Sequence, residues 1–318
     1  MKPLSETTYY MAPKLSHLLL AILVIFSIQT FEGRARTLKS EHQQSFSSIL
    51  QKLEGVQKGQ TAEGLLDLKK YLKKFGYYPS DATLTSIDFD DHLELALKTY
   101  QKYFRLNVTG NLDSSTTQQM MIPRCGVPDI INPHPSTEPN STESKHKKLH
   151  MVAHYDFGSQ KWPPSKYALT YTFGPGLQVF ELNTLRRVCK DAFQKWAEVT
   201  SFTFKEANDG ESADIVIAFY RGDHGDGASF DGPGKILAHG FFPQDGRLHY
   251  DADEKWSTDP AMDQTDLESV SVHEIGHLLG LYHSNDRKSI MYPSLQIGTK
   301  KRDLTQDDID GIHALYSN

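Results

Sequence analysis

The chain has 318 residues, of which 38% are hydrophobic and 11% aromatic, enough for a packed core, so a wholly disordered protein is excluded. The formal net charge of -6 argues against a strongly basic nucleic-acid-binding protein. The two cysteines allow at most one disulfide. The 14 histidines, several of which lie near acidic residues in the C-terminal half, indicate metal binding.

Residues 1–35 have the pattern of a secretory signal peptide. Lys2 and Lys14 precede an apolar run, 18–26, that is too short to span a bilayer comfortably. The small residues of Gly33-Arg34-Ala35 offer a cleavage site, and an uncut signal anchor is the alternative. Because no second apolar run and no lipid-anchor tail follow, we expect secretion without a stable membrane anchor.

A small helical unit is predicted between residue 36 and about residue 125. Asp113 can cap a third helix. The lysines between the apolar positions fit a solvated helix face better than a nucleic-acid patch. Apolar residues recur at helical spacing in two stripes: Leu65, Leu68, Leu72 and Phe75, then Leu93, Leu97, Tyr100 and Phe104.

A linker is predicted at 133–148, which is rich in proline and then basic. Proteolysis concentrates in exposed segments of this kind. The sequons at Asn107 and Asn140 are glycosylation sites if the chain is secreted.

After the linker, short strand-like runs precede two further helical segments, which predicts one α+β domain with a mixed sheet. The strand-like runs are 169–173, 202–204, 215–220 and 237–242, and the two later helical segments are 266–279 and 305–315. A helical stripe at 185–196 lies between the first two strand-like runs.

The segment 273–283 has the pattern of a catalytic zinc site. His273 and His277 are four residues apart, so a helix presents both imidazoles to one point. Gly280 suits a helix end with positive φ, after which the chain can turn back and bring His283 as a third ligand. Three protein ligands leave one position for water, as in catalytic zinc sites, and Glu274 lies beside that water as its base.

Two flanking features support this interpretation. Thr265-Asp266-Leu267-Glu268 is a candidate capping box that would begin the helix just before the motif. Met291 follows His283 by eight residues, where a methionine turn would run beneath the metal. The alternative is a helix with ordinary histidines, but the extended motif is far more specific than its first five residues.

These motifs resemble those of the matrixins, the matrix metalloproteinases of the metzincin clan. The segment 123–129, Pro-Arg-Cys-Gly-Val-Pro-Asp, has the matrixin cysteine-switch motif without departure. The resemblance implies that the Cys125 thiolate binds the catalytic zinc of a latent zymogen and that Arg124 pairs with an acid to hold the loop. A buried or disulfide-bonded Cys125 is the alternative, while Cys189 is expected to be a small core residue.

The resemblance also implies two further metal sites. A second cluster has a closed set of four ligands for a structural zinc: His224, Asp226, His239 and His249. At least one calcium ion would be bound by the side chains of Asp231, Asp251 and Glu254 and the carbonyls of Gly232, Gly234 and Ile236. An acidic surface turn is the alternative. The short loop 243–247 argues against a second calcium site involving Asp214.

The resemblance covers the chain from about residue 50 onward. It implies a propeptide at 36–150, with a three-helix, peptidoglycan-binding-like unit, and a catalytic domain at 151–318 with a twisted five-stranded mixed sheet and three helices. No hemopexin-like domain follows, so the layout is similar to that of minimal, plant-type matrixins. The expected location is the extracellular space or apoplast.

We therefore expect a secreted zinc endopeptidase that cleaves extracellular or cell-wall-associated proteins. Its partners would be protein or peptide substrates and protein inhibitors, with no nucleic acid, and it would act as a monomer. Substrate would contact the edge strand and the pocket beside the helix through four residues: Ala238, Ser269, Tyr292 and Pro293. The alternative is a catalytically weak matrix- or wall-binding protein, which would be expected to have lost Glu274.

Overall fold

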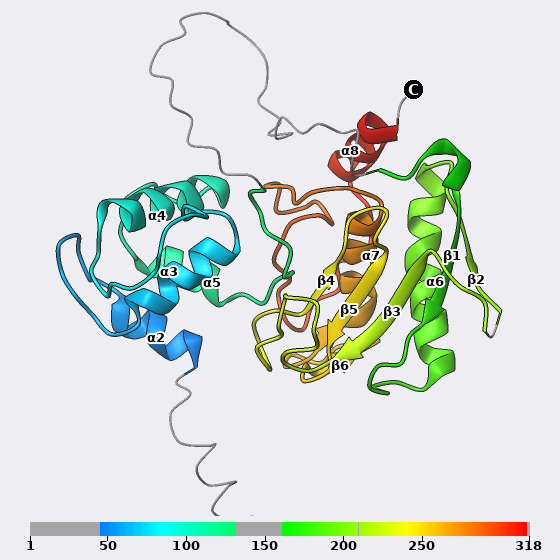
Figure 1. Cartoon of the computed structure of the whole chain (residues 1–318), viewed down its shortest axis with the longest axis horizontal. Helices are drawn as coiled ribbons and strands as arrows, with labels where there is room; N and C mark the ends of the chain where they lie inside the picture. The colour runs from blue at the N-terminus through cyan, green and yellow to red at the C-terminus, as the bar shows by residue number, and fades with distance from the viewer. Residues whose placement is uncertain (1–44, 132–160, 209, 317–318) are drawn as a thin grey trace, which may run out of the picture. The chain divides into compact units, whose positions relative to one another are not determined.

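A computed structural model describes residues 45–131, 161–208 and 210–316 (Figure 1). Residues 49–318 form one compact unit, and the described residues before it, 45–48, belong to another. The predicted signal peptide, the linker and the Asn140 sequon lie outside the described residues. Within the described part of the chain, no helix is long and apolar enough to cross a membrane.

Four helices lie in the described residues before the linker, where three were predicted. They are α2 (Phe46–Leu53), α3 (Leu65–Lys74), α4 (Asp91–Tyr103) and α5 (Ser114–Met121). The two predicted apolar stripes are buried, which confirms α3 and α4. Asp113 caps α5 as predicted, because its side chain accepts a hydrogen bond from the Thr116 amide.

The second half of the chain contains the predicted five-stranded mixed sheet. Its strands are β1 (Ala168–Phe173), β2 (Thr203–Glu206), β3 (Ile215–Tyr220), β4 (Ala238–Gly240) and β5 (Arg247–Asp251). The strand order is β2-β1-β3-β5-β4, and every neighbouring pair is parallel except β4 with β5. β4 is therefore an edge strand, as predicted for the strand that meets substrate. A short parallel ladder joins β6 (Trp256–Ser257) to β7 (Thr265–Asp266).

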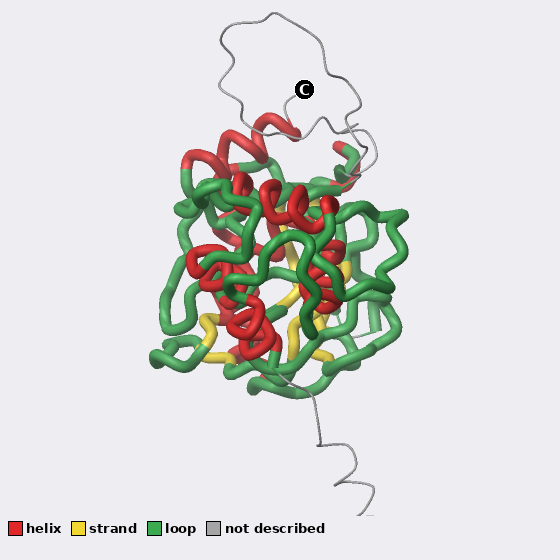
Figure 2. Tube along the Cα trace, turned by 90° about the vertical axis from the view of Figure 1, so that its left-hand side faces the viewer, coloured by secondary structure: helices red, strands yellow, loops and turns green. Residues whose placement is uncertain are grey.

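Three α-helices accompany this sheet, as the matrixin resemblance implied. They are α6 (Leu182–Val199), α7 (Leu267–Leu278) and α8 (Gln306–Tyr316). α6 and α7 pack against each other, and α7 contacts β4 and β5. The Trp196 indole is fully buried between these helices and donates to the Val272 carbonyl at 2.8 Å. Much of the remaining chain runs in loops between these short elements (Figure 2).

The two ends of α7 decide where its histidines point. The expected capping box is wrong in one respect: the cap is Asp266 rather than Thr265, and the Asp266 side chain accepts from the Ser269 amide. At the other end Gly280 has φ of +99°, as predicted. The amides of Gly280 and Leu281 donate to the carbonyls of His277 and Gly276, which closes the helix.

Candidate active site and metal centres

The three motif histidines and Cys125 converge on one point. His273 and His277 lie one turn apart on α7, and the turn at Gly280 brings His283 back beside them. The donor atoms of these three rings and the Cys125 sulfur all lie within 4.8 Å of one another. Their closest approaches are 3.1 Å between the Nε2 atoms of His277 and His283, and 3.5 Å from Cys125 Sγ to His277 Nε2.

Each ring is oriented by an acceptor on its other nitrogen. The Nδ1 atoms of His273 and His277 lie 2.7 Å from the carbonyl oxygens of Ile290 and Leu281. The Nδ1 of His283 lies 2.7 Å from Asp129 Oδ1. Because these oxygens can only accept, each Nδ1 carries the proton and each Nε2 presents a bare lone pair to the centre.

This donor set fits a zinc ion. Two lone pairs 3.1 Å apart repel each other unless a cation lies between them, and His273 Nε2 is buried without a hydrogen-bond partner among the described residues. Burial lowers the pKa of His273 and His277 well below the ordinary value, which keeps the rings neutral as ligands. Burial also raises the pKa of the Cys125 thiol, so a thiolate here requires a neighbouring cation.

Glu274 lies next to this centre on the same helix. The residue is fully buried, and neither carboxylate oxygen has a hydrogen-bond partner in the described part of the chain. Burial raises the pKa of Glu274 to about 8, and the nearby Cys125 side chain and Gly240 backbone offset this rise only in part. A carboxylate held without a partner beside a metal-ligand cluster is suited to take a proton from water.

The predicted methionine turn packs beneath this helix. Met291 is 2% exposed, and its sulfur would lie 2.3 Å from a Cβ atom placed on Gly276. Trp196 would also contact that Cβ. The glycine inside the motif is therefore required by the close approach of Met291.

The segment that carries Cys125 lies between the edge strand and the chain after Met291. Gly126 donates to the Ala238 carbonyl at 2.8 Å, and Cys125 donates to the Pro293 carbonyl at 2.9 Å. Arg124 bridges in parallel to Ile236. Its guanidinium pairs with Asp129 at 2.6 Å, with both side chains buried.

The Arg124 guanidinium also lies over the Phe75 ring, and its Cζ atom is 3.5 Å from the ring centroid. Burial alone would raise the pKa of Asp129, but Arg124 and His283 lower it to about 2.

Cys125 and Cys189 are both free, so the disulfide alternative is wrong for this structure, and Cys189 is buried in the core as expected.

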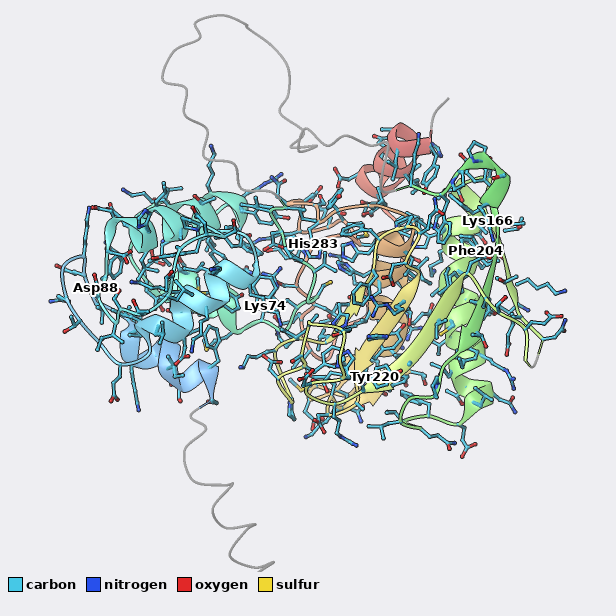
Figure 3. All side chains as sticks on the ribbon, in the orientation of Figure 1. Lys74, Asp88, Lys166, Phe204, Tyr220 and His283 are labelled. Carbon is cyan, nitrogen blue, oxygen red and sulfur yellow. The ribbon has the colours of Figure 1, made fainter. Side chains whose placement is uncertain are left out.

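The second predicted cluster forms at the end of the sheet. Asp226 Oδ2 lies 2.7 Å from His224 Nε2, 2.8 Å from His239 Nε2 and 2.8 Å from His249 Nδ1. Burial lowers the pKa of His239 to about 4, which leaves the imidazole neutral. Tyr220, at the end of β3 (Figure 3), stacks on His224 with ring centroids 4.9 Å apart.

The strand geometry explains how two of these ligands meet. Leu248 and Tyr250 on β5 point into the core, so His249 between them points to the opposite face. His239 on β4 pairs directly across from His249. Within the part of the chain that the structure describes, the group consists of four donors, which matches the closed set of a structural zinc site.

The carboxylates of the predicted calcium site lie near enough to influence one another, although their oxygens are not all within 4.8 Å of one another as the donors of the two histidine clusters are. Asp231 Oδ1 and Glu254 Oε1 accept from the amides of Ile236 and Gly234 at 3.2 and 2.6 Å. Burial, together with the neighbouring carboxylates, raises the pKa of Asp251 to about 6 and of Glu254 to about 7. Such a concentration of negative charge fits a divalent cation with oxygen ligands.

Asp214 is differently placed. Its carboxylate pairs with the Lys166 ammonium at 2.5 Å and accepts from Thr170. These contacts occupy the Asp214 carboxylate within the protein.

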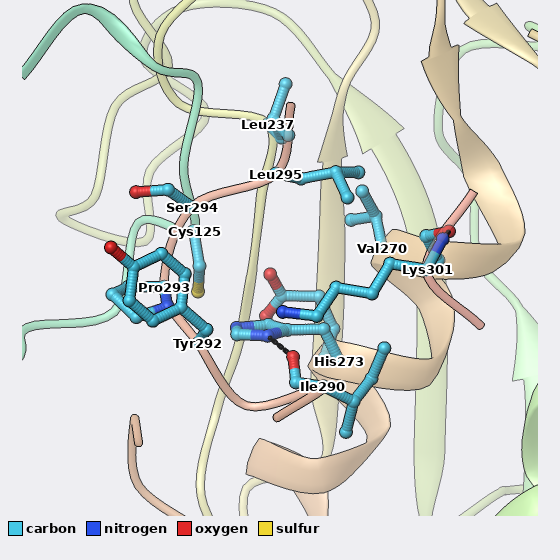
Figure 4. A pocket seen from close by; sticks show the side chains of 12 residues that line it. Cys125, Leu237, Val270, His273, Ile290, Tyr292, Pro293, Ser294, Leu295 and Lys301 are labelled. Carbon is cyan, nitrogen blue, oxygen red and sulfur yellow. Dashed lines mark hydrogen bonds between the residues drawn. The ribbon is translucent and has the colours of Figure 1, made fainter. Parts of the chain in front are cut away.

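A pocket opens beside the metal centre (Figure 4). Ser269, Tyr292 and Pro293 line it as predicted, and Ala238 lies on the edge strand, where it was expected. No motif pointed to Lys301, which also lines the pocket and whose side chain runs toward His273 in the close-up. Its neighbours in the pocket wall are mainly apolar: Leu237, Val270, Ile290 and Leu295.

An extended histidine motif on a buried helix, a glutamate beside it and a mixed sheet with an edge strand next to that helix define a zinc-dependent metallopeptidase. Comparison with known proteins narrows this class. Residues 161–317 match the matrixin family of peptidases, and residues 61–120 match a putative peptidoglycan binding domain.

Individual relatives agree with these matches. The chain is 46% identical to Metalloendoproteinase 1 of Glycine max, over 81% of this chain and 83% of that protein. It is 43% identical to Metalloendoproteinase 2-MMP of Arabidopsis thaliana, over 82% and 73%. It is 35% identical to Matrix metalloproteinase-16 of Mus musculus, over 80% of this chain and 42% of that protein. The chain belongs to the matrixin family and is a zinc metalloendopeptidase that acts on proteins.

Proposed function

We propose that the protein is secreted as a latent zymogen and cleaves extracellular or cell-wall-associated proteins once its prosegment is removed. One observation carries the proposal: the Cys125 sulfur lies among three bare imidazole nitrogens, where it blocks the position that a water molecule needs. A thiolate is a strong zinc ligand, so a protein folded in this way is closed to substrate.

In the active form, His273, His277 and His283 would hold the catalytic zinc. Bound zinc lowers the pKa of its water toward neutrality and polarises the scissile carbonyl. Glu274 takes the proton of the attacking water on its carboxylate and passes it to the leaving amine nitrogen. The apolar surroundings that raise the pKa of Glu274 make this carboxylate a better base than an exposed one.

Substrate backbone would pair with β4 in place of the prosegment. The Ala238 carbonyl, which accepts from Gly126 in the latent form, becomes available when that segment leaves. The side chain after the scissile bond would enter the pocket lined by Ser269, Tyr292 and Pro293. The small Ser269 leaves room there for a large apolar side chain.

The other two metal sites would stabilise the fold. We propose a structural zinc at His224, Asp226, His239 and His249. We propose calcium at the carboxylates of Asp231, Asp251 and Glu254 and the carbonyls of Gly232, Gly234 and Ile236. The four donors of the structural zinc site leave no ligand position for water, and a calcium ion held by oxygen ligands would serve the fold, so neither site is expected to take part in catalysis.

Activation would divide the chain into a propeptide, 36–150, and a catalytic domain, 151–318, after removal of a signal peptide, 1–35. Asn107 is exposed on the propeptide and, with Asn140, would be glycosylated in a secreted chain. We further propose a monomer that protein inhibitors can block at the same cleft.

The test is hydrolysis of a quenched peptide by the full-length chain. It should be inactive as isolated, become active after a thiol-reactive mercurial captures Cys125, and lose activity again with a zinc chelator. Activity in the untreated full chain equal to that of a separately expressed domain from residue 151 would contradict latency. Turnover that resists the chelator would contradict the zinc mechanism.

A second candidate function is wall binding through the helical unit, which the match at 61–120 favours. It predicts that the full-length chain sediments with insoluble cell-wall polysaccharide and that the domain from residue 151 does not. Equal sedimentation of both forms would remove this candidate.

A further inference from the structure

The acceptors of the three zinc-site histidines come from different parts of the chain. His273 and His277 donate to carbonyls of Ile290 and Leu281, which stay with the catalytic domain. His283 donates to Asp129, which lies in the prosegment 154 residues away. The prosegment therefore reaches this metal centre twice, once with Cys125 and once with Asp129.

The Asp129 carboxylate that accepts from His283 is buried and held by several further hydrogen bonds. The side chains of Asp129 and His283 are both fully buried. The same oxygen that accepts from His283 accepts from Arg124 at 2.6 Å, and the other oxygen accepts from the Tyr77 hydroxyl at 2.6 Å. The Asp129 amide donates to the Phe75 carbonyl at 3.1 Å. The carboxylate thus has no freedom to turn away from the histidine.

We propose that Asp129 is a positioning residue for His283, through which the prosegment helps the latent protein to retain its zinc independently of the Cys125 thiolate. The inference rests on the proposed function, because it requires the three histidines to bind zinc. A carboxylate that accepts from Nδ1 fixes the tautomer with its lone pair on Nε2 and makes that nitrogen a stronger donor. Partners of this kind change metal affinity by about 10–100-fold.

Loss of the prosegment would then weaken the centre in two separable ways. The thiolate leaves the metal, and His283 also loses the acceptor that orients its ring. His273 and His277 keep their carbonyl acceptors, so His283 becomes the least firmly held of the three ligands. The mature enzyme should consequently release zinc to a chelator more readily than the loss of Cys125 alone explains.

The experiment measures zinc affinity of the full-length chain by competition with a chromogenic chelator. All variants carry Glu274→Gln so that none can trim itself, and each is made with Cys125 intact and with Cys125→Ala. A His277→Ala variant identifies which of the binding steps belongs to this centre. Tyr77→Phe is the matched control, because it removes a hydrogen bond to Asp129 without touching the oxygen that faces His283.

Asp129→Ala should weaken zinc binding at this step by about 10–100-fold, and by a similar factor in the Cys125→Ala background. Asp129→Asn, which keeps an oxygen acceptor but no charge, should weaken zinc binding by a smaller factor. Tyr77→Phe should bind zinc as tightly as the parent. In cobalt-substituted protein, the visible absorption bands that report ligand geometry should shift in Asp129→Ala and stay unchanged in Tyr77→Phe.

The proposal is overturned if Asp129→Ala weakens binding only when Cys125 is present, since Asp129 would then act by holding the loop. It is also overturned if Tyr77→Phe and Asp129→Ala weaken zinc binding by the same factor. If Asp129→Ala does not fold, Asp129→Asn takes its place, and zinc binding by Asp129→Asn as tight as in the parent overturns the proposal. A parent protein that shows no zinc step sensitive to His277→Ala would instead contradict the proposed function.

Discussion

The two histidine clusters of this protein use similar ligands in opposite ways. The cluster at His224, Asp226, His239 and His249 includes its own carboxylate, whose Oδ2 lies within 2.8 Å of all three rings. The cluster on α7 has three neutral rings, and its fourth donor, Cys125, belongs to the segment that we propose is removed on activation. A centre that is complete within one domain can only stabilise, whereas a centre completed by a removable segment can be switched.

The largest expected effect concerns the unpaired glutamate, which is found at only one of the two clusters. Glu274→Ala should keep both zinc ions and the fold but lose about 10²–10⁴-fold in kcat, because the general base is gone. Peptide hydrolysis by the activated enzyme, with metal content measured alongside, tests this. Glu268→Ala on the same helix is the matched control, because Glu268 pairs with Arg302 and lies away from the centre. A tenth of the parental activity in zinc-loaded Glu274→Ala would show that another group is the base.

The next effect separates the removable donor from the permanent ones. Full-length Cys125→Ser replaces a thiolate with a poor neutral ligand. It should therefore hydrolyse peptide while its own chain is still uncut, at least about tenfold faster than the parent, a change that corresponds to about 1.4 kcal/mol. Cys189→Ala, at the other free cysteine, should stay latent. The assay needs serine-protease inhibitors to prevent activation by contaminants. If Cys125→Ser stays latent while the domain from residue 151 is active, steric blockade alone closes the site.

Loss of a ligand from the cluster that contains Asp226 should lower the stability of the fold and not the turnover. His249→Ala should lower the thermal midpoint by roughly 5–10 °C, because a ligand at 100 times its Kd contributes about 2.7 kcal/mol. The exposed His92→Ala is the control and should leave the midpoint unchanged. Differential scanning calorimetry of the zinc-loaded chain measures both. A His249→Ala protein that melts like the parent would contradict the structural zinc.

The smallest expected effect is a pH dependence at the calcium carboxylates. Their raised pKa values, about 6 for Asp251 and about 7 for Glu254, mean that the metal-free folded state favours the protonated forms. The stability that these groups contribute is full below pH 4 and is lost as pH rises through 6 and 7. With a calcium-selective chelator the midpoint should therefore fall by a few degrees between pH 5 and pH 8, beyond any change seen with calcium.

Two variants sharpen this measurement. Glu254→Gln should remove most of the response to calcium, whereas Asp263→Asn, an exposed carboxylate paired with Lys255, should keep it. A midpoint that ignores calcium at every pH would leave the acidic surface turn as the correct interpretation of residues 231–254.

Local patterns allowed much of this structure to be predicted. The spacing of His273 and His277 places both rings on one helix face in any fold, and the apolar run 215–220 became β3 with the predicted bounds. The strand β5 was missed because its central residue is a histidine on the metal-facing side, which breaks the apolar run. The helix cap was misplaced by one residue because Thr265 and Asp266 are both good capping residues, and only the fold selects between them.

Contacts between distant parts of the chain could not be predicted in this way. The bond from His283 to Asp129 joins residues 154 positions apart, and no periodicity relates them. Lys301 reaches the pocket from a loop far along the chain, because its amide donates to Ser269 at 2.7 Å. Family resemblance predicted the ligand sets but not these neighbours.

The pairing of His239 with His249 has a consequence for the cleft on the other side of the same strand. Ala238 and His239 point to opposite faces of β4, so a slip of one residue against β5 would exchange them. β4 has only three residues, too few for its backbone bonds to fix the register firmly. The structural zinc that we propose would require both histidines and so would accept only one alignment. It would therefore fix the register of the edge strand along which we propose that substrate binds.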